Sequence, residues 1–481
     1  MSLAIVKFVF TIVIFVYWTT LSIADVPLTI EDYVNESLQL QCKDEISLNF
    51  SNAVISKINQ DFISSPIITC LNLIGNNIMN IGKGAFNKVP NLTHLFLSNN
   101  KLDELFNFGT HDKLQVLIIN EARNIDINFG ISLSDYCLYR YSKTIHIFGE
   151  YPNLEILSLR LNCISELQFS PLMEQETSHF EKHYDIISKV LFPKLKILDL
   201  SENTIKRTNF INLISNNLYF LDLHNNLIDS LNLYEKGNNL FALNLNNNNF
   251  NSISHQNNPC LSMVGLKNLH YLSVFNNKVK VIDSNAFQDN GKLLYLNLSS
   301  NYINYIYPDT FANLQYLKTL DLSINELENV PQISKEIELN SLYINYNNIT
   351  KLFSHSFVQM PKLTTLLLGQ NNIDEIDVNA FADLSNLEEL DLSKNMLRFL
   401  PQNWADSLVS IKYLDLSSNY FISLEHLSLS NASPLTEVYL TMNPLEYLNV
   451  AYFKNLPQNL TINLIDKSKF AKYYKYKFQK I

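Results

Sequence analysis

Five aspartates occur in the same three-residue context, Leu-Asp-Leu, and are the first residues whose type and spacing suggest chemistry. They are Asp199, Asp222, Asp321, Asp391 and Asp415. Carboxylates held on neighbouring short strands can act as a general acid and base or bind a cation. Leu-Asp-Leu-Ser is also a common filling of repeated short strands, and this structural interpretation is the simpler one. The aspartates therefore predict no catalytic residue.

Two histidines form a second arrangement that suggests chemistry. His179 and His183 are four residues apart, so on a helix they share one face and can hold a metal ion. Their pattern is not His-Glu-x-x-His, and no third ligand lies nearby in the sequence. The chain also contains no Gly-x-Ser-x-Gly elbow, phosphate-binding loop or paired-cysteine zinc motif. We therefore expect neither an enzyme nor a metal or cofactor site.

The elements that position these residues belong to one repeated pattern. The template Leu-x-x-Leu-x-Leu-x-x-Asn-x-Leu-x-x-Leu occurs in fifteen copies, which are 24 residues apart between Leu269 and Leu435 except for one spacing of 22. The copies begin at Ile68, Leu92, Leu114, Leu154, Leu195, Leu218, Leu240, Leu269, Leu293, Leu317, Leu339, Leu363, Leu387, Ile411 and Leu435. Alternating leucines predict a short strand whose leucines point inward. Stacked copies predict an α/β solenoid, curved, with a parallel sheet on its concave side and a cap at each end.

An asparagine-rich stretch, LFALNLNNNNFNSI from Leu240 to Ile253, can be assigned within this pattern. Asn248 falls on the asparagine position of the template, whereas Asn244 and Asn246 fall on positions that face the concave solvent. A carboxamide both donates and accepts, so stacked asparagines can satisfy buried backbone groups that would otherwise cost ~1–3 kcal/mol each. We expect the loss of Asn248 to destabilise the array far more than the loss of Asn246.

The period is broken in three places, which defines the expected organisation. The spacings that begin at Leu114, Leu154 and Leu240 are 40, 41 and 29 residues. The second insertion has the apolar spacing of an amphipathic helix between Met173 and Leu191. We expect a signal peptide (1–24), an N-terminal cap (25–67), a solenoid (68–458) with insertions near 122–150, 170–192 and 254–266, and a C-terminal cap with a lysine- and tyrosine-rich tail (459–481).

The first residues of the chain predict export. Lys7 precedes an apolar stretch from Phe8 to Tyr17, and small residues lead to a cleavage position after Ala24, which is the pattern of a secretory signal peptide. The alternative is an uncleaved anchor, but a span needs ~20 apolar residues and this stretch is shorter. No later segment is long and apolar enough to span a membrane. The net charge of −10 does not favour nucleic-acid binding. We expect a secreted, extracellular protein without an integral span after cleavage.

Five cysteines and seven glycosylation sequons fit this compartment. A Cys137–Cys163 disulfide would close the first insertion, and a Cys42–Cys70 disulfide would join the N-terminal cap to the array. Cys260 remains; it is either a buried or free thiol or the site of a disulfide-linked partner. The sequons begin at Asn35, Asn49, Asn91, Asn297, Asn348, Asn431 and Asn459.

The repeat resembles the "typical" extracellular leucine-rich repeats of Toll-type receptor ectodomains, chaoptin-like adhesion proteins and secreted insect immune proteins. The resemblance covers roughly residues 46–464 and implies a horseshoe-shaped leucine-rich-repeat fold. Asn443-Pro444 matches the opening of the C-terminal cap of such proteins, but Tyr447 and Leu448 stand where cysteines are expected. The resemblance implies a secreted ectodomain that binds a partner.

The repeat register also gives a candidate ligand-binding patch on the concave face. Its residues are Phe220, Tyr271, Phe275, Tyr295, Asp321, Tyr343 and Tyr346. Exposed aromatic side chains on a rigid sheet suit protein recognition, because they bury a large area at low entropic cost. The alternative is that tyrosine is simply abundant, with 25 in the chain. Asn297 lies in this patch, and a glycan there would push binding elsewhere.

The function expected from these features is non-enzymatic binding of an extracellular protein or glycan, in innate immunity, adhesion or receptor-like recognition. The alternative is a structural component of the extracellular matrix or a stabilising subunit of another exported protein. The segment from Asp466 to Ile481 holds six lysines among five aromatic residues. It is either a solvated terminus or a contact for an anionic surface.

Overall fold

The computed structural model describes residues 46–464 with gaps. The gaps are residues 61, 107, 123–136, 138–141, 149, 171–190, 235, 255–259, 430–433, 447–448, 450–451, 453, 455 and 458. The signal peptide, Asn35, Cys42, Asn431 and the lysine-rich tail lie outside the described residues. So does almost all of the helix expected between Met173 and Leu191, including the pair His179 and His183.

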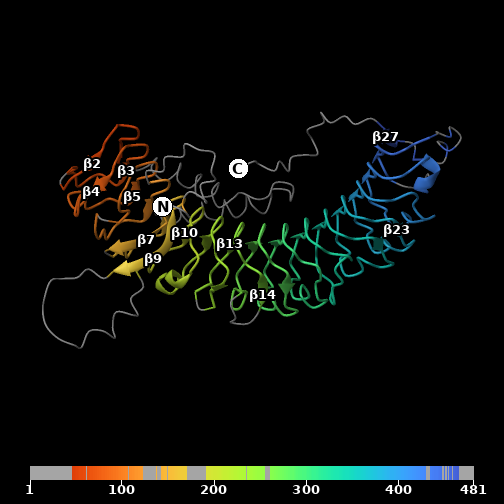
Figure 1. Cartoon of the computed structure of the whole chain (residues 1–481), viewed down its shortest axis with the longest axis horizontal. Coiled ribbons are helices and arrows are strands. Elements are labelled where there is room, and N and C mark those ends of the chain that lie inside the picture. The colour runs from red at the N-terminus through yellow and green to blue at the C-terminus, as the bar shows by residue number, and fades with distance from the viewer. Residues whose placement is uncertain are drawn as a thin grey trace, which may run out of the picture.

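A 17-stranded parallel sheet runs the length of the described chain, and its strands follow one another in chain order along a curved row (Figure 1). The strands are β1 (Ser47–Asn49), β3 (Cys70–Asn72), β5 (His94–Phe96), β6 (Val116–Ile118), β8 (Ile156–Ser158), β10 (Ile197–Asp199), β11 (Phe220–Asp222), β13 (Ala242–Asn244), β16 (Tyr271–Ser273), β18 (Tyr295–Asn297), β19 (Thr319–Asp321), β20 (Ser341–Tyr343), β22 (Thr365–Leu367), β24 (Glu389–Asp391), β25 (Tyr413–Asp415), β26 (Glu437–Tyr439) and β27 (Thr461–Asn463). This confirms the predicted solenoid with a parallel sheet.

The template leucines form one continuous core. In each strand the central residue points inward and pairs in register with the central residue of the next, as Leu296 does with Leu320. Leu293, Leu296 and Leu298 of one copy are all fully buried. Since each copy buries its apolar face only against its neighbours, the core extends along the whole array.

Short elements close the opposite side of each copy. They are β2 (Lys57–Ile58), β4 (Asn80–Ile81), β12 (Leu231–Asn232), β14 (Ser252–Ser254), β15 (Leu261–Ser262), β17 (Val281–Ile282), β21 (Lys351–Leu352), β23 (Glu375–Ile376), η3 (Asn209–Leu213) and η4 (Leu424–Leu427). Buried aromatic rings stack between copies here, with centroids 6.0 Å apart for Phe287 and Phe311 and also for Phe357 and Phe381.

The template asparagines form the expected ladder. Asn248 accepts a hydrogen bond from the backbone N–H of Ile228 at 3.0 Å, and its Nδ2 donates to the carbonyls of Leu223, Leu245 and Asn246. The ladder is altered at Ala122, which has no carboxamide. There the N–H of Leu102 donates to the backbone carbonyl of Ala122 at 2.6 Å instead.

The first insertion adds a separate parallel pair, β7 (Lys143–Phe148) and β9 (Ile164–Ser170). The predicted disulfide between Cys137 and Cys163 is present, with Cα atoms 5.0 Å apart, and it ties this insertion to the ladder turn. Across the part of the chain that the structure describes, no helix is long and apolar enough to cross a membrane.

Candidate binding face

Two columns of side chains line the concave face, one from the first and one from the third residue of each strand. From β16 to β27 the first column is Tyr271, Tyr295, Thr319, Ser341, Thr365, Glu389, Tyr413, Glu437 and Thr461, and the second is Ser273, Asn297, Asp321, Tyr343, Leu367, Asp391, Asp415, Tyr439 and Asn463. Most of these side chains are half-buried. The two columns hold five carboxylates and five tyrosines and not one lysine, arginine or histidine. We call them the concave columns.

Eight of the same positions nearer the N-terminus are apolar and buried. Cys70, Phe96, Val116, Ile118, Ile156, Ile197, Phe220 and Ala242 form one cluster in which each is only 2–7% exposed. Phe220, predicted to contribute to the patch, therefore packs inside this cluster. The accessible part of the columns begins at β16.

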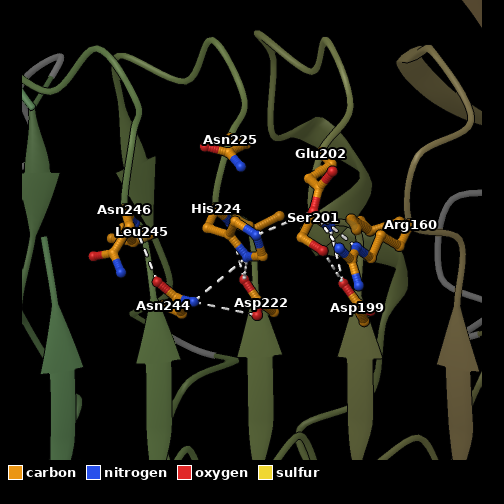
Figure 2. A network of polar contacts seen from close by, with 12 residues as sticks. Arg160, Asp199, Ser201, Glu202, Asp222, His224, Asn225, Asn244, Leu245 and Asn246 are labelled. Carbon is orange, nitrogen blue, oxygen red and sulfur yellow. Dashed lines mark hydrogen bonds and ion pairs between the residues drawn. The ribbon is translucent and has the colours of Figure 1, made fainter. Parts of the chain in front are cut away.

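A network of charged side chains lies at the ends of β10, β11 and β13, strands that also contribute to this cluster (Figure 2). Arg160 donates through Nε to Oε1 of Glu202 at 2.9 Å. His224 lies between two carboxylates, with Nδ1 2.8 Å from Asp222 and Nε2 3.7 Å from Glu202. Asn244 donates to Asp222 at 3.2 Å, which links the network to the asparagine-rich stretch.

The electrostatics of this network keep His224 charged. Burial alone would lower its pKa, but the opposing effects of Asp222, Glu202 and Asp199 outweigh burial and raise the pKa of His224 to about 10. Burial and the neighbouring Asp222 raise the pKa of Asp199. Because the network is self-compensating, we assign it a structural role in holding neighbouring copies together.

The concave columns beyond β20 contain carboxylates but no cation of their own, and the nearby charge of Lys394 only partly offsets the burial of Asp391 and Asp415. Glu389, Tyr413 and Glu437 are neighbours in the first column, and Asp391, Asp415 and Tyr439 are neighbours in the second. Burial and the proximity of Asp415 raise the pKa of Asp391 to about 6. The pKa of Glu389 is also raised, by burial and by Asp391 and Asp415. A cationic partner would relieve this repulsion.

A glycine keeps space beside these carboxylates. A Cβ atom at Gly369 would lie 2.8 Å from Oδ2 of Asp391 and 3.0 Å from Oγ of Ser393. The backbone N–H of Gly369 donates to Asn345 at 2.7 Å, so this strand end is fixed. Asp391 is thus bordered by backbone on this side.

The remaining residues of the predicted patch lie on or beside the columns. Tyr271 and Tyr295 pair in register with ring centroids 6.5 Å apart, and Asp321 pairs in register with Tyr343. Phe275 follows β16 and is half-buried. Tyr346, 49% exposed, lies past the end of β20 with a φ of 56°. The structure therefore places all seven predicted residues on or beside the columns, and among them only Phe220 is buried.

Asn297 occupies the second column beside Asp321. Its Oδ1 accepts hydrogen bonds from the N–H and the hydroxyl of Ser299 at 2.9 and 2.6 Å. A glycan on Asn297 would stand over the columns. Asn91 lies on the lateral edge and contacts Lys113, far from the tyrosines. Asn49, Asn348 and Asn459 are also among the described residues.

Cys70 and Cys260 lie outside the first insertion. Cys70 is disulfide-bonded, and its expected partner Cys42 lies outside the described residues. Cys260 is a thiol outside any described disulfide, it is 4% exposed, and burial raises its pKa. A partner cannot reach it without local opening.

One repeated feature was missed by the sequence reasoning: a second ladder on the lateral edge of the sheet. Asparagines directly before the first template leucine donate to a carbonyl of the preceding copy, as Asn153 does to Asp112 at 2.7 Å. Lysines at the same position bridge back, as Lys194 does to Asn153 at 2.6 Å. The signal was a recurrent Asn or Lys at that position, namely Asn91, Lys113, Asn153, Lys194, Asn217, Asn239, Asn268, Lys292, Lys362 and Asn386.

This lateral edge also carries a shallow groove of about 300 Å³. Both of its carboxylates are paired. Glu338 lies 2.7 Å from Lys318 within the groove, and Glu388 lies 2.8 Å from Lys412, which is just outside it. The groove adjoins the copy of 22 residues between Leu317 and Leu339. Its balanced charges contrast with the cation-free concave columns.

Comparison with known families identifies the repeat. A leucine-rich-repeat family model matches residues 267–327, 315–373, 337–388 and 361–421, and a second, for the BspA type leucine-rich-repeat region, matches residues 16–129. The chain is a leucine-rich-repeat protein.

Relatives of this leucine-rich-repeat protein include human Toll-like receptor 3, which is 26% identical over 329 residues, 63% of this chain and 32% of the receptor. Mouse podocan is 27% identical over 321 residues, 59% of this chain and 49% of podocan. The chain thus spans between a third and a half of the length of these relatives. No enzyme family is among the matches, and the relatives are a receptor and other leucine-rich-repeat proteins.

Solved structures share the fold of this leucine-rich-repeat protein. A leucine-rich-repeat protein from Leptospira interrogans aligns with a TM-score of 0.51 at 22% identity, over 80% of this chain and 93% of the other. The functional domain of InlJ from Listeria monocytogenes aligns with a TM-score of 0.52 at 18% identity, over 82% and 74%. At these identities the likeness concerns the fold alone.

Proposed function

We propose that this leucine-rich-repeat protein is an exported, non-enzymatic binding protein that recognises an extracellular protein through the concave columns between β16 and β26. The observation that carries this proposal is the composition of the columns: five tyrosines and five carboxylates, with no cation among them. Tyrosines supply contact area at low entropic cost, and a face rich in carboxylates favours a basic partner. The relatives, among them a Toll-like receptor, support a role in recognition, and innate immunity is the setting we propose.

The test is capture of partners from extracellular fluid, followed by direct binding of each purified partner. The variant replaces Tyr271, Tyr295 and Tyr343 together with alanine. We expect it to lose at least tenfold in affinity, since buried aromatic anchors contribute about 2 kcal/mol or more each. The matched control replaces Tyr302, Tyr305 and Tyr307, which are 48–58% exposed outside the concave columns.

Three outcomes would overturn the proposal. Equal binding by both triple variants would move the site off the columns. Partners that survive protease treatment of the fluid would indicate a glycan ligand. A chain that captures nothing but its own copies or matrix components would favour the structural alternative.

A further inference from the structure

The basic segment, residues 465–481, has the chemistry that the concave columns lack. It contains six lysines and five aromatic residues against one acid, Asp466. The columns near β24 to β26 contain Glu389, Asp391, Asp415 and Glu437 with Tyr413 and Tyr439. The two parts of the chain therefore carry opposite charges, and both contain aromatic rings. We propose that the basic segment docks on the concave columns of β24 to β26 of its own chain.

The point where the segment begins supports docking in cis. The last described strand, β27, pairs in parallel with β26, and Asn463 lies in register with Tyr439 in the second column. Residue 465 therefore follows directly after the column that contains Asp415 and Asp391. The distance from β27 to β24 is three strand spacings, about 14 Å. A segment of this length reaches roughly 55 Å when extended, so tethering does not prevent contact.

The carboxylates of the columns gain from such an occupant. Among the described concave-column residues from β16 to β27 none is basic. The pKa values of Glu389, Asp391 and Asp415 are all raised, burial being the largest cause, although Lys394 beside the columns lowers those of Asp391 and Asp415. Lysines bring charge to these groups, and their aliphatic stems with the interleaved rings cover Tyr413 and Tyr439. A tethered ligand binds at an effective concentration in the millimolar range, so modest affinity suffices.

The inference concerns the same face as the proposed function but does not require an external partner. If both hold, a basic partner must displace the basic segment before it binds. The lateral groove is the competing place for lysines, because it carries Glu338 and Glu388. Those two carboxylates already pair with Lys318 and Lys412, which makes the groove the weaker site.

The experiment measures tryptic cleavage within the basic segment of the intact full chain, followed by mass spectrometry, with a free peptide of residues 465–481 as reference. Docking predicts cleavage about tenfold slower in the chain than in the peptide at low salt. The double variant Glu389→Gln with Glu437→Gln is expected to restore the rate of the peptide. The matched control is Glu338→Gln with Glu388→Gln, which removes the same charge from the lateral edge and is expected to leave protection unchanged.

Two further measurements show where the basic segment docks and whether it docks within its own chain. Carbodiimide coupling in the native chain should join segment lysines to Glu389 or Glu437. Protection should be independent of protein concentration between about 0.5 and 50 μM, because a tether fixes the local concentration. Equal cleavage of chain and peptide, loss of protection in the control, or protection that grows with concentration would each overturn docking in cis. No partner takes part in this assay, so failure of the proposed function would leave its result unchanged.

Discussion

The side-chain oxygen of Asn248 accepts a hydrogen bond from the backbone N–H of Ile228, one copy earlier, at 3.0 Å. Three backbone carbonyls accept hydrogen bonds from its Nδ2. Asn248→Ala leaves these buried groups unpaired, and we expect a loss of about 2–4 kcal/mol in the free energy of unfolding, measured by urea denaturation. Asn249→Ala, one residue on in the turn, is the control and should change it by less than about 0.5 kcal/mol.

Asn246 needs a revised expectation, because it is not simply solvated. Its Oδ1 accepts hydrogen bonds from the hydroxyl of Ser273 at 2.6 Å and the N–H of Phe275 at 2.9 Å. Asn246→Ala should therefore cost about 1 kcal/mol, between the other two variants. Equal effects of Asn246→Ala and Asn248→Ala would contradict the ladder.

His224 should make stability depend on pH in the alkaline range. Its pKa is raised from 6.5 to about 10 in the folded chain. The stability it contributes is therefore fully present below about pH 6.5 and is lost as the pH rises through 10. His224→Gln should cost about 3–5 kcal/mol at pH 7, because Asp222 and Glu202 lose the charge between them. The measurement is urea unfolding at pH 6.5 and 9.5.

The control for this prediction is His355→Gln. His355 pairs with Asp383 at 3.0 Å but is 55% exposed. Exposed pairs contribute about 1 kcal/mol or less. A wild-type chain whose stability is the same at pH 6.5 and 9.5 would show that His224 does not carry the charge.

The charge of Asp391 should destabilise the folded chain at neutral pH, whereas the charge of His224 stabilises it. Its pKa is raised from 3.8 to about 6, so the stability associated with the protonated form is present below about pH 3.8 and is lost as the pH rises through 6. Asp391→Asn keeps an acceptor for the N–H of Ser393 and removes the charge. We expect it to stabilise the chain by about 1–3 kcal/mol at pH 7 and by little at pH 4.

The measurement for Asp391→Asn is thermal or urea unfolding in 0.5 M salt, where attraction to basic groups is screened. Burial, the largest cause of the raised pKa, is not screened by salt. A variant that is less stable than the wild type at pH 7 would mean that a nearby cation already compensates the charge of Asp391.

Cys260 should be unreactive in the folded chain. It is 4% exposed, and burial raises the pKa of its thiol. We expect labelling by a disulfide reagent to be about a hundredfold slower in buffer than in urea, because only the exposed thiolate reacts. A chain without a titratable thiol in urea would instead indicate a disulfide-linked partner.

Much of the fold follows from the period alone. Once Leu243 and Leu245 are placed inward, the position of Asn248 in the ladder follows, because the template fixes their spacing. The same register put Tyr295 and Asp321 on one face. It also contains the lateral ladder, since Asn153 and Lys194 occupy the same place in successive copies.

Other features depend on neighbours that the period does not specify. Phe220 and Tyr271 occupy equivalent positions, yet Phe220 is buried, because it packs against Ile197 and Ala242 in the apolar cluster. The charge of His224 depends on Glu202 from the preceding copy, 3.7 Å away. Such burial and electrostatics arise only when all copies are packed together.

The substitution at Ala122 has a consequence for how the array loses its structure. Both long insertions follow the junction between the copies that begin at Leu92 and Leu114, and the carboxamide that would join these copies is replaced by the backbone carbonyl of Ala122. Nearest-neighbour coupling determines whether such arrays unfold as a whole or in blocks. We therefore expect the stretches before and after this junction to open separately on partial denaturation, with the amide protons of one remaining protected from exchange while the other opens.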